Sequence, residues 1–244
     1  MLLLGLATLT LAPLPALAFC LCLGARGPTL RAGAHTLHLW ARLACRVLGI
    51  RVHQQGRPPA GACLLASNHL GYVDILVLAS CYPGMFLSMA EVGRWPMVGA
   101  LARLVGTLFI DRARLSDVAP AHAAMARHLT GGLKVTFFPE GRASSGRAVG
   151  RFHSALLQAA RASGVRCVPV ALSYDADAPI EPSLSVCWWG EMTFLPHFRA
   201  LLALEGFQAR VVFGEPLPAS EDRKALARAL QERVEKAFVP VRQP

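Results

Sequence analysis

Charged side chains are scarce in this chain: they make up 16% of the 244 residues, whereas hydrophobic residues make up 54%. This balance is too apolar for an ordinary soluble protein and too polar for a protein that crosses a membrane many times. The segment Met1–Ala25 contains no charged residue at all. It is long enough to span a bilayer, although Pro13 and Pro15 favour a kinked or re-entrant helix pair as readily as one straight span. No basic residue precedes the apolar run, which argues against a signal peptide.

Acidic residues are also few, with 15 Asp and Glu against 25 Lys and Arg, so the net charge is +10. A basic chain of this kind binds either nucleic acid or an anionic membrane surface. No run of basic residues interleaved with aromatic residues occurs. The composition therefore predicts a membrane partner and no nucleic acid.

The seven cysteines form no Cys-x2-Cys pair, and their number is odd. These two features argue against a disulfide framework and against a structural zinc site. A reducing, cytoplasmic setting with no metal centre is expected. The chain also has no Gly-x-Ser-x-Gly motif, which disfavours a hydrolase that would use Ser67, Ser144 or a cysteine as its nucleophile.

The segment Leu30–Ile50 is amphipathic. Its basic residues lie on one side of a helix and most of its apolar residues on the other: Arg31, His35, His38, Arg42 and Arg46 oppose Leu37, Trp40, Leu43, Val47 and Leu48. This pattern is typical of a helix at a lipid headgroup layer, and it also suits a helix that packs its apolar face on its own domain. Since the charge-free segment precedes it, we predict that residues 1–50 form membrane-docking helices. A polar Gly/Pro connector from Arg51 leads to a second domain, residues 58–244.

In this second domain, short apolar runs alternate with helical patterns, which indicates an α/β layered domain with a mostly parallel or mixed sheet. Seven runs are predicted as strands: Cys63–Ala66, Met85–Met89, Thr107–Ile110, Val135–Phe138, Cys167–Leu172, Ser185–Trp189 and Arg210–Phe213. Four segments are predicted as helices: Trp95–Leu104, Ser116–Leu129, Phe152–Ala162 and Glu221–Phe238, the last with Ser220 as its N-cap.

The stretch Cys63–Pro83 carries the first candidate site. Its apolar start predicts a strand, and a helix is expected to open near Asp74, so His69 would lie at a strand-to-helix turn. A helix N-terminus disfavours imidazolium, and Asp74 can fold back to fix the ring tautomer, as in a His–Asp dyad with a general base. The spacing alone equally describes a turn histidine beside a helix-capping aspartate.

Two further strands end in polar residues. Asp111 and Arg112 follow the strand that begins at Gly106, and Arg112 would bind an anionic headgroup or pair with a nearby carboxylate. Phe137-Phe-Pro is followed by Glu140, Gly141 and Arg142. Gly141 permits close backbone approach, and Glu140 is a candidate for binding a hydroxyl-bearing substrate or for orienting basic residues.

Asn-His-x4-Asp, Gly-x-x-Phe-Ile-Asp-Arg, Phe-Pro-Glu-Gly and Val-Pro-Val occur in this order, and together they resemble the four blocks of the glycerolipid acyltransferases. The chain is most similar to the bacterial 1-acyl-sn-glycerol-3-phosphate (lysophosphatidic acid) acyltransferases and their lysophospholipid-acylating relatives, from about Arg46 to Phe238. The resemblance implies that His69 is the general base and Asp74 its orienting carboxylate. It also implies that Arg112, Glu140 and Gly141 bind the lysolipid.

The resemblance implies transfer of a fatty acyl group from acyl-CoA or acyl carrier protein to a lysophospholipid hydroxyl, most simply giving phosphatidic acid. No cofactor is expected, and a bacterial inner membrane, at its cytoplasmic face, is the expected location. One departure affects the headgroup: the family commonly has Glu-Gly-Thr, whereas this chain has Glu-Gly-Arg142-Ala143. Arg142 would then take over anion binding, or the site would suit a less charged acceptor such as lyso-ornithine lipid. A non-catalytic lipid-binding protein on the same scaffold is the remaining alternative.

Overall fold

A computed structural model describes residues 26–95, 98–111, 115–177, 179–220 and 222–244. Its described strands form one seven-stranded sheet in the order β1-β7-β6-β2-β5-β3-β4. Their bounds are Ile50–Gln55 (β1), Leu64–Ser67 (β2), Met85–Met89 (β3), Leu108–Ile110 (β4), Val135–Phe137 (β5), Cys167–Asp175 (β6) and Phe207–Phe213 (β7). Neighbouring strands run parallel except β6 and β7. The predicted α/β class and the mostly parallel seven-stranded sheet are confirmed.

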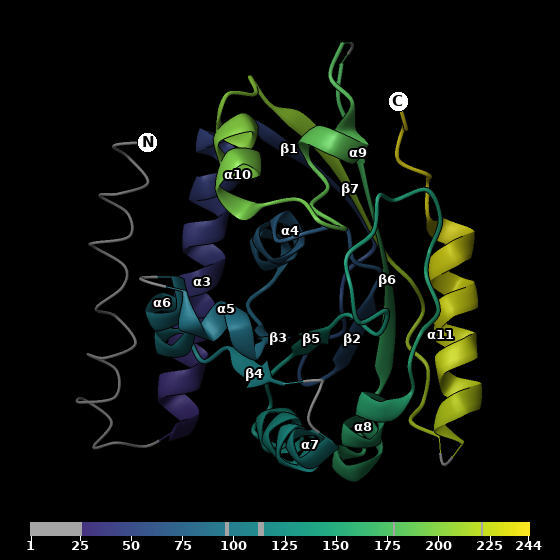
Figure 1. Cartoon of the computed structure of the whole chain (residues 1–244). Helices are drawn as coiled ribbons and strands as arrows, with labels where there is room; N and C mark the ends of the chain where they lie inside the picture. Colours follow the sequence, from purple (N-terminus) through teal and green to yellow (C-terminus); the bar gives the residue numbers. More distant parts are fainter. Residues whose placement is uncertain (1–25, 96–97, 112–114, 178, 221) are drawn as a thin grey trace.

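Helices cover both faces of the sheet (Figure 1). The long helices α3 (Arg26–Val47) and α11 (Arg223–Ala237) lie at opposite sides of the molecule. The other helices are α4 (Val73–Cys81), α5 (Ala90–Arg94), α6 (Val98–Leu104), α7 (Leu115–Thr130), α8 (Gln158–Ser163), α9 (Pro182–Ser185) and α10 (Phe194–Leu202), with a 3-10 turn η1 (Ala155–Leu157) before α8. Two hydrophobic clusters fill the layers, one against α3 and α4 and the other against α7, α8 and α11.

The strand β2 shows why a parallel strand reads as a continuous apolar run. Leu65 belongs to the cluster that also contains residues of α4, and Leu64 and Ala66 belong to the cluster on the other face. All four residues of β2 are buried. A strand covered on both sides cannot alternate polar and apolar residues.

One predicted strand is wrong and one strand was missed. Ser185–Trp189 is not a strand: Pro182 starts the short helix α9, and the N–H groups of Ser185 and Val186 donate to the carbonyls of Glu181 and Pro182. The missed strand is β1, which lies in the stretch interpreted as a polar connector. It is an edge strand paired only with β7, and Ile50 is its one buried residue, so it gives no alternating signal.

Some helix boundaries also differ from the prediction. The segment Trp95–Leu104 was predicted as one helix. In the structure, Trp95 is the C-cap residue of α5, and the helix α6 begins only at Val98. The last helix begins at Arg223, and its N-cap is Asp222 rather than Ser220. The Asp222 carboxylate accepts hydrogen bonds from the N–H groups of Lys224 and Ala225, which have no partner inside the helix.

The helix α3 packs its apolar side on its own domain. Ala41 and Cys45 are buried in the cluster that includes α4, and a ring nitrogen of His38 donates to the Ala79 carbonyl at 2.7 Å. Arg42 and Arg46 remain exposed on the outer side. Of the two alternatives for this amphipathic segment, the structure shows the packed one. None of the described helices has the length and apolarity needed to cross a bilayer, and Met1–Ala25 lies outside the described residues.

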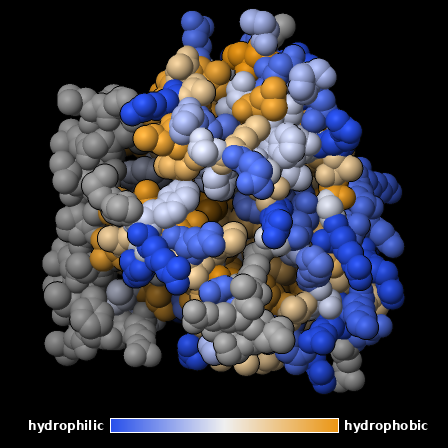
Figure 2. All heavy atoms as spheres, viewed as in Figure 1, coloured by the Kyte–Doolittle hydropathy of each residue, from blue (hydrophilic) through white to orange (hydrophobic). Residues whose placement is uncertain are grey.

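Surface hydropathy is unevenly distributed (Figure 2). Hydrophilic residues gather over α11, at the right of the view, and hydrophobic ones appear near the top, where α9 and α10 lie. Leu184 on α9 and Leu195 on α10 are among the large apolar residues with exposed side chains.

Candidate active site

The candidate site lies where parallel strands end at one edge of the sheet. His69 follows β2, the strand between β6 and β5, and Glu140 follows β5. Asp74 is in the first turn of α4, the helix that continues from the β2 end. Carboxyl ends of parallel strands meet at the same edge, so residues far apart in sequence converge there.

His69 and Asp74 form the expected dyad contact. The Nδ1 atom of His69 lies 2.6 Å from Oδ2 of Asp74, and the His69 side chain is 21% exposed. With Nδ1 bonded to a carboxylate, that nitrogen carries the proton and Nε2 is left as the acceptor. The His69 ring stacks on Phe138, with centroids 4.1 Å apart and planes at 15°. In this tautomer Nε2, which has no hydrogen-bond partner among the described residues, can accept a proton.

Asp74 is fully buried and holds the turn around His69. Its Oδ2 atom also accepts from the N–H groups of Leu70 (2.6 Å) and Gly71 (3.1 Å). Its other oxygen, Oδ1, accepts from the hydroxyl of Tyr174 at 2.7 Å. These two N–H groups belong to the turn between His69 and α4. Asp74 therefore both orients the His69 ring and stabilises this turn.

The third sequence block holds the backbone of His69. The N–H group of His69 donates to Oε1 of Glu140 at 2.9 Å, and its carbonyl accepts from the N–H of Ser144 at 2.9 Å. The loop after β5 therefore fixes the backbone of His69, whereas Asp74 bonds to its ring.

Glu140 has both carboxylate oxygens bonded to backbone N–H groups. Its Oε2 atom accepts from Gly150 at 3.0 Å. A Cβ atom at position 150 would lie 2.5 Å from that oxygen, which explains the glycine. Burial raises the pKa of Glu140 to about 7, although the bonds from His69 and Gly150 oppose the shift. In the structure, Glu140 thus holds the backbone at His69 and Gly150, and its predicted roles toward substrate or basic side chains stay predictions.

The raised pKa of Glu140 predicts a specific dependence of stability on pH. The folded protein binds this proton more tightly than the unfolded chain, so ionised Glu140 lowers the free energy of unfolding as pH rises from about 4.5 to about 7. The loss is on the order of 3 kcal/mol. Glu140→Gln should remove this slope, as measured by chemical denaturation at several pH values. Parallel curves for the two proteins would contradict the prediction.

No role was assigned from the sequence to two residues of the site. Asn68 bonds both atoms of its amide to the backbone of Leu172 at 2.8 Å, which extends the pairing of β2 and β6 past the end of β2. Tyr174 reaches Asp74 from the end of β6. Both bonds join residues about one hundred positions apart, so no local spacing could reveal them.

The other predicted substrate-binding residues are placed differently from one another. Arg112 lies outside the described residues. Gly141 has φ +85, a conformation that favours glycine, directly after Glu140. Arg142 is exposed and makes no ion pair with Glu140 or with any other residue in the described part of the chain.

The two candidate nucleophilic serines do not contact the His69 ring. Ser67 is fully buried, and its hydroxyl has no hydrogen-bond partner among the described residues. The Ser144 hydroxyl lies 3.4 Å from the His69 carbonyl oxygen. Neither arrangement activates a serine, since activation needs a bond from the hydroxyl to the ring nitrogen. The described residues contain no cluster of three or more potential metal ligands.

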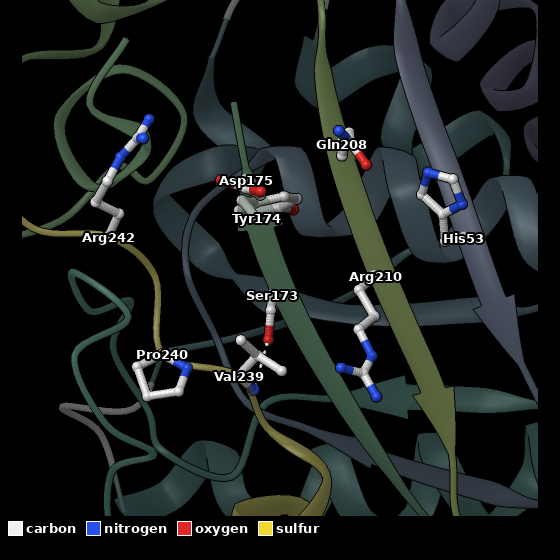
Figure 3. Close-up of a pocket in the computed structure, with 9 residues that line it drawn as sticks. All are labelled: His53, Ser173, Tyr174, Asp175, Gln208, Arg210, Val239, Pro240 and Arg242. Carbon is white, nitrogen blue, oxygen red and sulfur yellow. Dashed lines mark hydrogen bonds between the residues drawn. The ribbon is translucent and has the colours of Figure 1, made fainter. Parts of the chain in front are cut away.

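A groove of about 440 Å³ lies on the other face of β6 (Figure 3). Ser173 points into it and accepts from the N–H of Val239 at 3.0 Å. Successive side chains of a strand point to opposite faces, so the neighbouring Tyr174 sends its hydroxyl to Asp74 instead. Tyr174 therefore borders the groove and also bonds to the His69 site through its hydroxyl.

Comparisons with known proteins identify the family of the chain. The model of the family described as Acyltransferase matches residues 49–173. The chain is 34% identical to the lyso-ornithine lipid O-acyltransferase of Pseudomonas aeruginosa, over 82% of this chain and 76% of that one. It is 31% identical to the 1-acyl-sn-glycerol-3-phosphate acyltransferase of Neisseria meningitidis serogroup B, over 79% and 75%. The fold resembles the crystal structure of the 1-acyl-sn-glycerophosphate (LPA) acyltransferase of Thermotoga maritima, with a TM-score of 0.66, 19% identity and coverage of 97% and 93%.

Proposed function

The chain belongs to the acyltransferase family, and from this membership we propose that it transfers a fatty acyl group from an acyl thioester to the free hydroxyl of a lysolipid. The observation that carries the proposal is the dyad: Nδ1 of His69 bonds to a buried aspartate, and Nε2 of this partly exposed side chain has no partner among the described residues. A non-catalytic lipid-binding protein would have no use for this arrangement.

In the proposed reaction, Nε2 of His69 takes the proton of the acceptor hydroxyl as its oxygen attacks the thioester carbonyl. Asp74 holds the ring tautomer and stabilises the imidazolium that forms. Backbone N–H groups stabilise the negative charge on the carbonyl oxygen. The C–S bond then breaks, an ester forms, and the leaving thiolate takes the proton from His69. No atom is oxidised or reduced in this reaction, and the thioester is already an activated acyl donor. We therefore propose no metal or redox cofactor.

Two acceptors deserve a direct comparison. Lysophosphatidic acid is the one that the four sequence blocks suggested, and the Neisseria relative is named for this substrate. Lyso-ornithine lipid is the second candidate, because relatives from Pseudomonas aeruginosa and Brucella abortus, each 34% identical to this chain, are named for that lipid. The altered third block, with an exposed Arg142 followed by Ala143, also fits a different headgroup.

The test is a transfer assay with purified protein in which both lysolipids are crossed with acyl-CoA and acyl carrier protein as donors. Acyl transfer to either lysolipid, lost in a dyad variant, supports the proposal. Thioester hydrolysis without an acylated lipid would favour a hydrolase. Lipid binding without any turnover would favour the non-catalytic alternative.

Docking at the cytoplasmic face of the bacterial inner membrane is proposed through residues 1–50. The packed side of α3 is occupied by α4, so the outer side with Arg42 and Arg46 would face anionic headgroups. Deleting Met1–Ala25 should release much of the protein from membranes, because that segment supplies apolar residues without charge.

The contribution of the basic residues of α3 to membrane binding can be tested separately. Each basic residue near an anionic surface contributes about 1 kcal/mol, so reversing Arg42 and Arg46 to Glu should weaken binding to anionic vesicles at least roughly 10-fold at low salt. The matched control is Arg233→Glu with Lys236→Glu on α11, which changes the net charge equally at the opposite side of the molecule (Figure 1). Equal losses in both double variants would show that only net charge matters, and the orientation would be wrong.

A further inference from the structure

We propose that Tyr174 is a positioning residue for acyl transfer: its hydroxyl holds the Asp74 carboxylate so that the other oxygen faces Nδ1 of His69. The proposal rests on the proposed roles of His69 and Asp74. It assigns a function to a residue outside the four sequence blocks, because Tyr174 lies five positions beyond the proline of Val-Pro-Val.

The hydrogen bonds of Asp74 are unequally divided between its two oxygens. Oδ2 accepts from His69 and from two backbone N–H groups, whereas Oδ1 accepts from Tyr174 alone among the described residues. Asp74 is fully buried, and no ion pair with a Lys or Arg accompanies it in that part of the chain. Within the described residues, the Tyr174 hydroxyl is therefore the one group that satisfies Oδ1, and it restrains the carboxylate from the side that the three bonds to Oδ2 leave open.

The position of the Tyr174 hydroxyl is set by rigid elements. Tyr174 is buried at the end of β6, and its ring meets Phe207 on β7 edge-to-face, with centroids 5.7 Å apart. Two residues earlier, Leu172 is bonded to Asn68, the residue before His69. The same strand thus sets the position of His69 through Asn68 and that of Asp74 through Tyr174.

The hydroxyl also acts as a donor under all working conditions. Burial raises the pKa of Tyr174, and the nearby Asp74 carboxylate raises it further. A protonated phenol bonded to Oδ1 draws part of the carboxylate charge away from Oδ2. Without it, Oδ2 would carry more of the negative charge and would attract a positively charged ring more strongly.

Other titratable groups surround the dyad and must be considered in a pH profile. Glu140 reaches the backbone of His69 from the loop after β5, with its pKa raised to about 7. Cys187 lies near Asp74, and burial raises the pKa of its thiol. Both groups remain in a Tyr174 variant, so a change in the profile relative to the parent protein reports the loss of the hydroxyl.

The test compares Tyr174→Phe with Tyr82→Phe in the full-length protein. Tyr82 is the matched control, because it is also buried. Its hydroxyl shares a hydrogen bond with the hydroxyl of Thr136, away from the dyad. Tyr174→Phe should lower kcat about 10-fold with the KM of both substrates nearly unchanged, and move the acid limb of the pH–rate profile to higher pH. Tyr82→Phe should change neither kcat nor the profile.

If Tyr174→Phe lowers thermal stability like Tyr82→Phe but leaves kcat and the pH profile as in the parent, the hydroxyl has a structural role only and the proposal fails. If His69→Ala keeps full activity, the proposed function of the dyad fails instead, whatever Tyr174→Phe does. The two failures are therefore distinguishable.

Discussion

Replacing His69 with alanine is expected to lower the rate of acyl transfer by roughly 10²–10⁴-fold, the usual contribution of a positioned general base. The expectation follows from a ring whose Nδ1 is bonded to Asp74 while Nε2 has no partner in the described part of the chain. The fold should persist, since the backbone bonds of position 69 to Glu140 and Ser144 do not need the imidazole. Initial rates with saturating donor, together with thermal denaturation, measure the two effects separately.

Asp74→Asn distinguishes the dyad from a histidine that acts alone. An amide has one oxygen and one NH₂ group, so it cannot accept from His69, two backbone N–H groups and Tyr174 at once. Most of the activity should be lost, because the ring tautomer is no longer defined. Full activity in this variant would show that Asp74 only stabilises the turn.

A covalent route through a cysteine is the mechanism to exclude. Burial raises the pKa of Cys45 and Cys63 to about 11, and that of Cys81 and Cys167 to about 12, which leaves little nucleophilic thiolate at neutral pH. Cys20 and Cys22 lie outside the described residues. A folded variant without any cysteine should keep its activity; complete loss would make direct attack on the thioester the wrong mechanism.

The sequence predicted those parts of the site that depend on local spacing. His69 and Asp74 are five residues apart across a strand-to-helix turn, so the turn itself brings the ring to the carboxylate. Glu140 could be placed near His69 because the two residues follow parallel strands. Its actual hydrogen-bond partners are backbone N–H groups. Tyr174 and Asn68 could not be predicted, because strand order alone brings β6 beside the turn.

The same physical limit applies to the fold. The strands β2, β3 and β5 are covered on both faces and give continuous apolar runs, so their positions were found to within a residue or so. β1 has a solvent-exposed side and only one paired edge, and its polar residues resemble a connector. Ser185–Trp189 was wrongly predicted as a strand for the converse reason. Its apolar residues pack inside the protein after a short helix, but they pair with no described strand. Burial can be inferred from composition, whereas pairing cannot.

Arg142→Ala is expected to raise the KM for lysophosphatidic acid roughly 10- to 100-fold, because a charge-assisted bond to the phosphate is lost. The guanidinium is exposed and unpaired within the described residues, so it is available to a ligand. Screening by water at an exposed site places the expected effect toward the lower end of this range. The KM for the acyl donor should barely change, which separates headgroup binding from a general defect.

The matched control is Arg147→Ala, an exposed arginine in the same loop beyond Gly146, which should leave both constants unchanged. Lyso-ornithine lipid supplies the decisive contrast, since its ornithine headgroup lacks a phosphate. If Arg142→Ala raises KM for lysophosphatidic acid only, Arg142 binds the phosphate in place of the family's Thr-containing block. If Arg142→Ala changes neither acceptor while Arg112→Ala abolishes activity with lysophosphatidic acid, headgroup binding depends on a single arginine. A site with so little positive charge would fit the less charged lysolipid better.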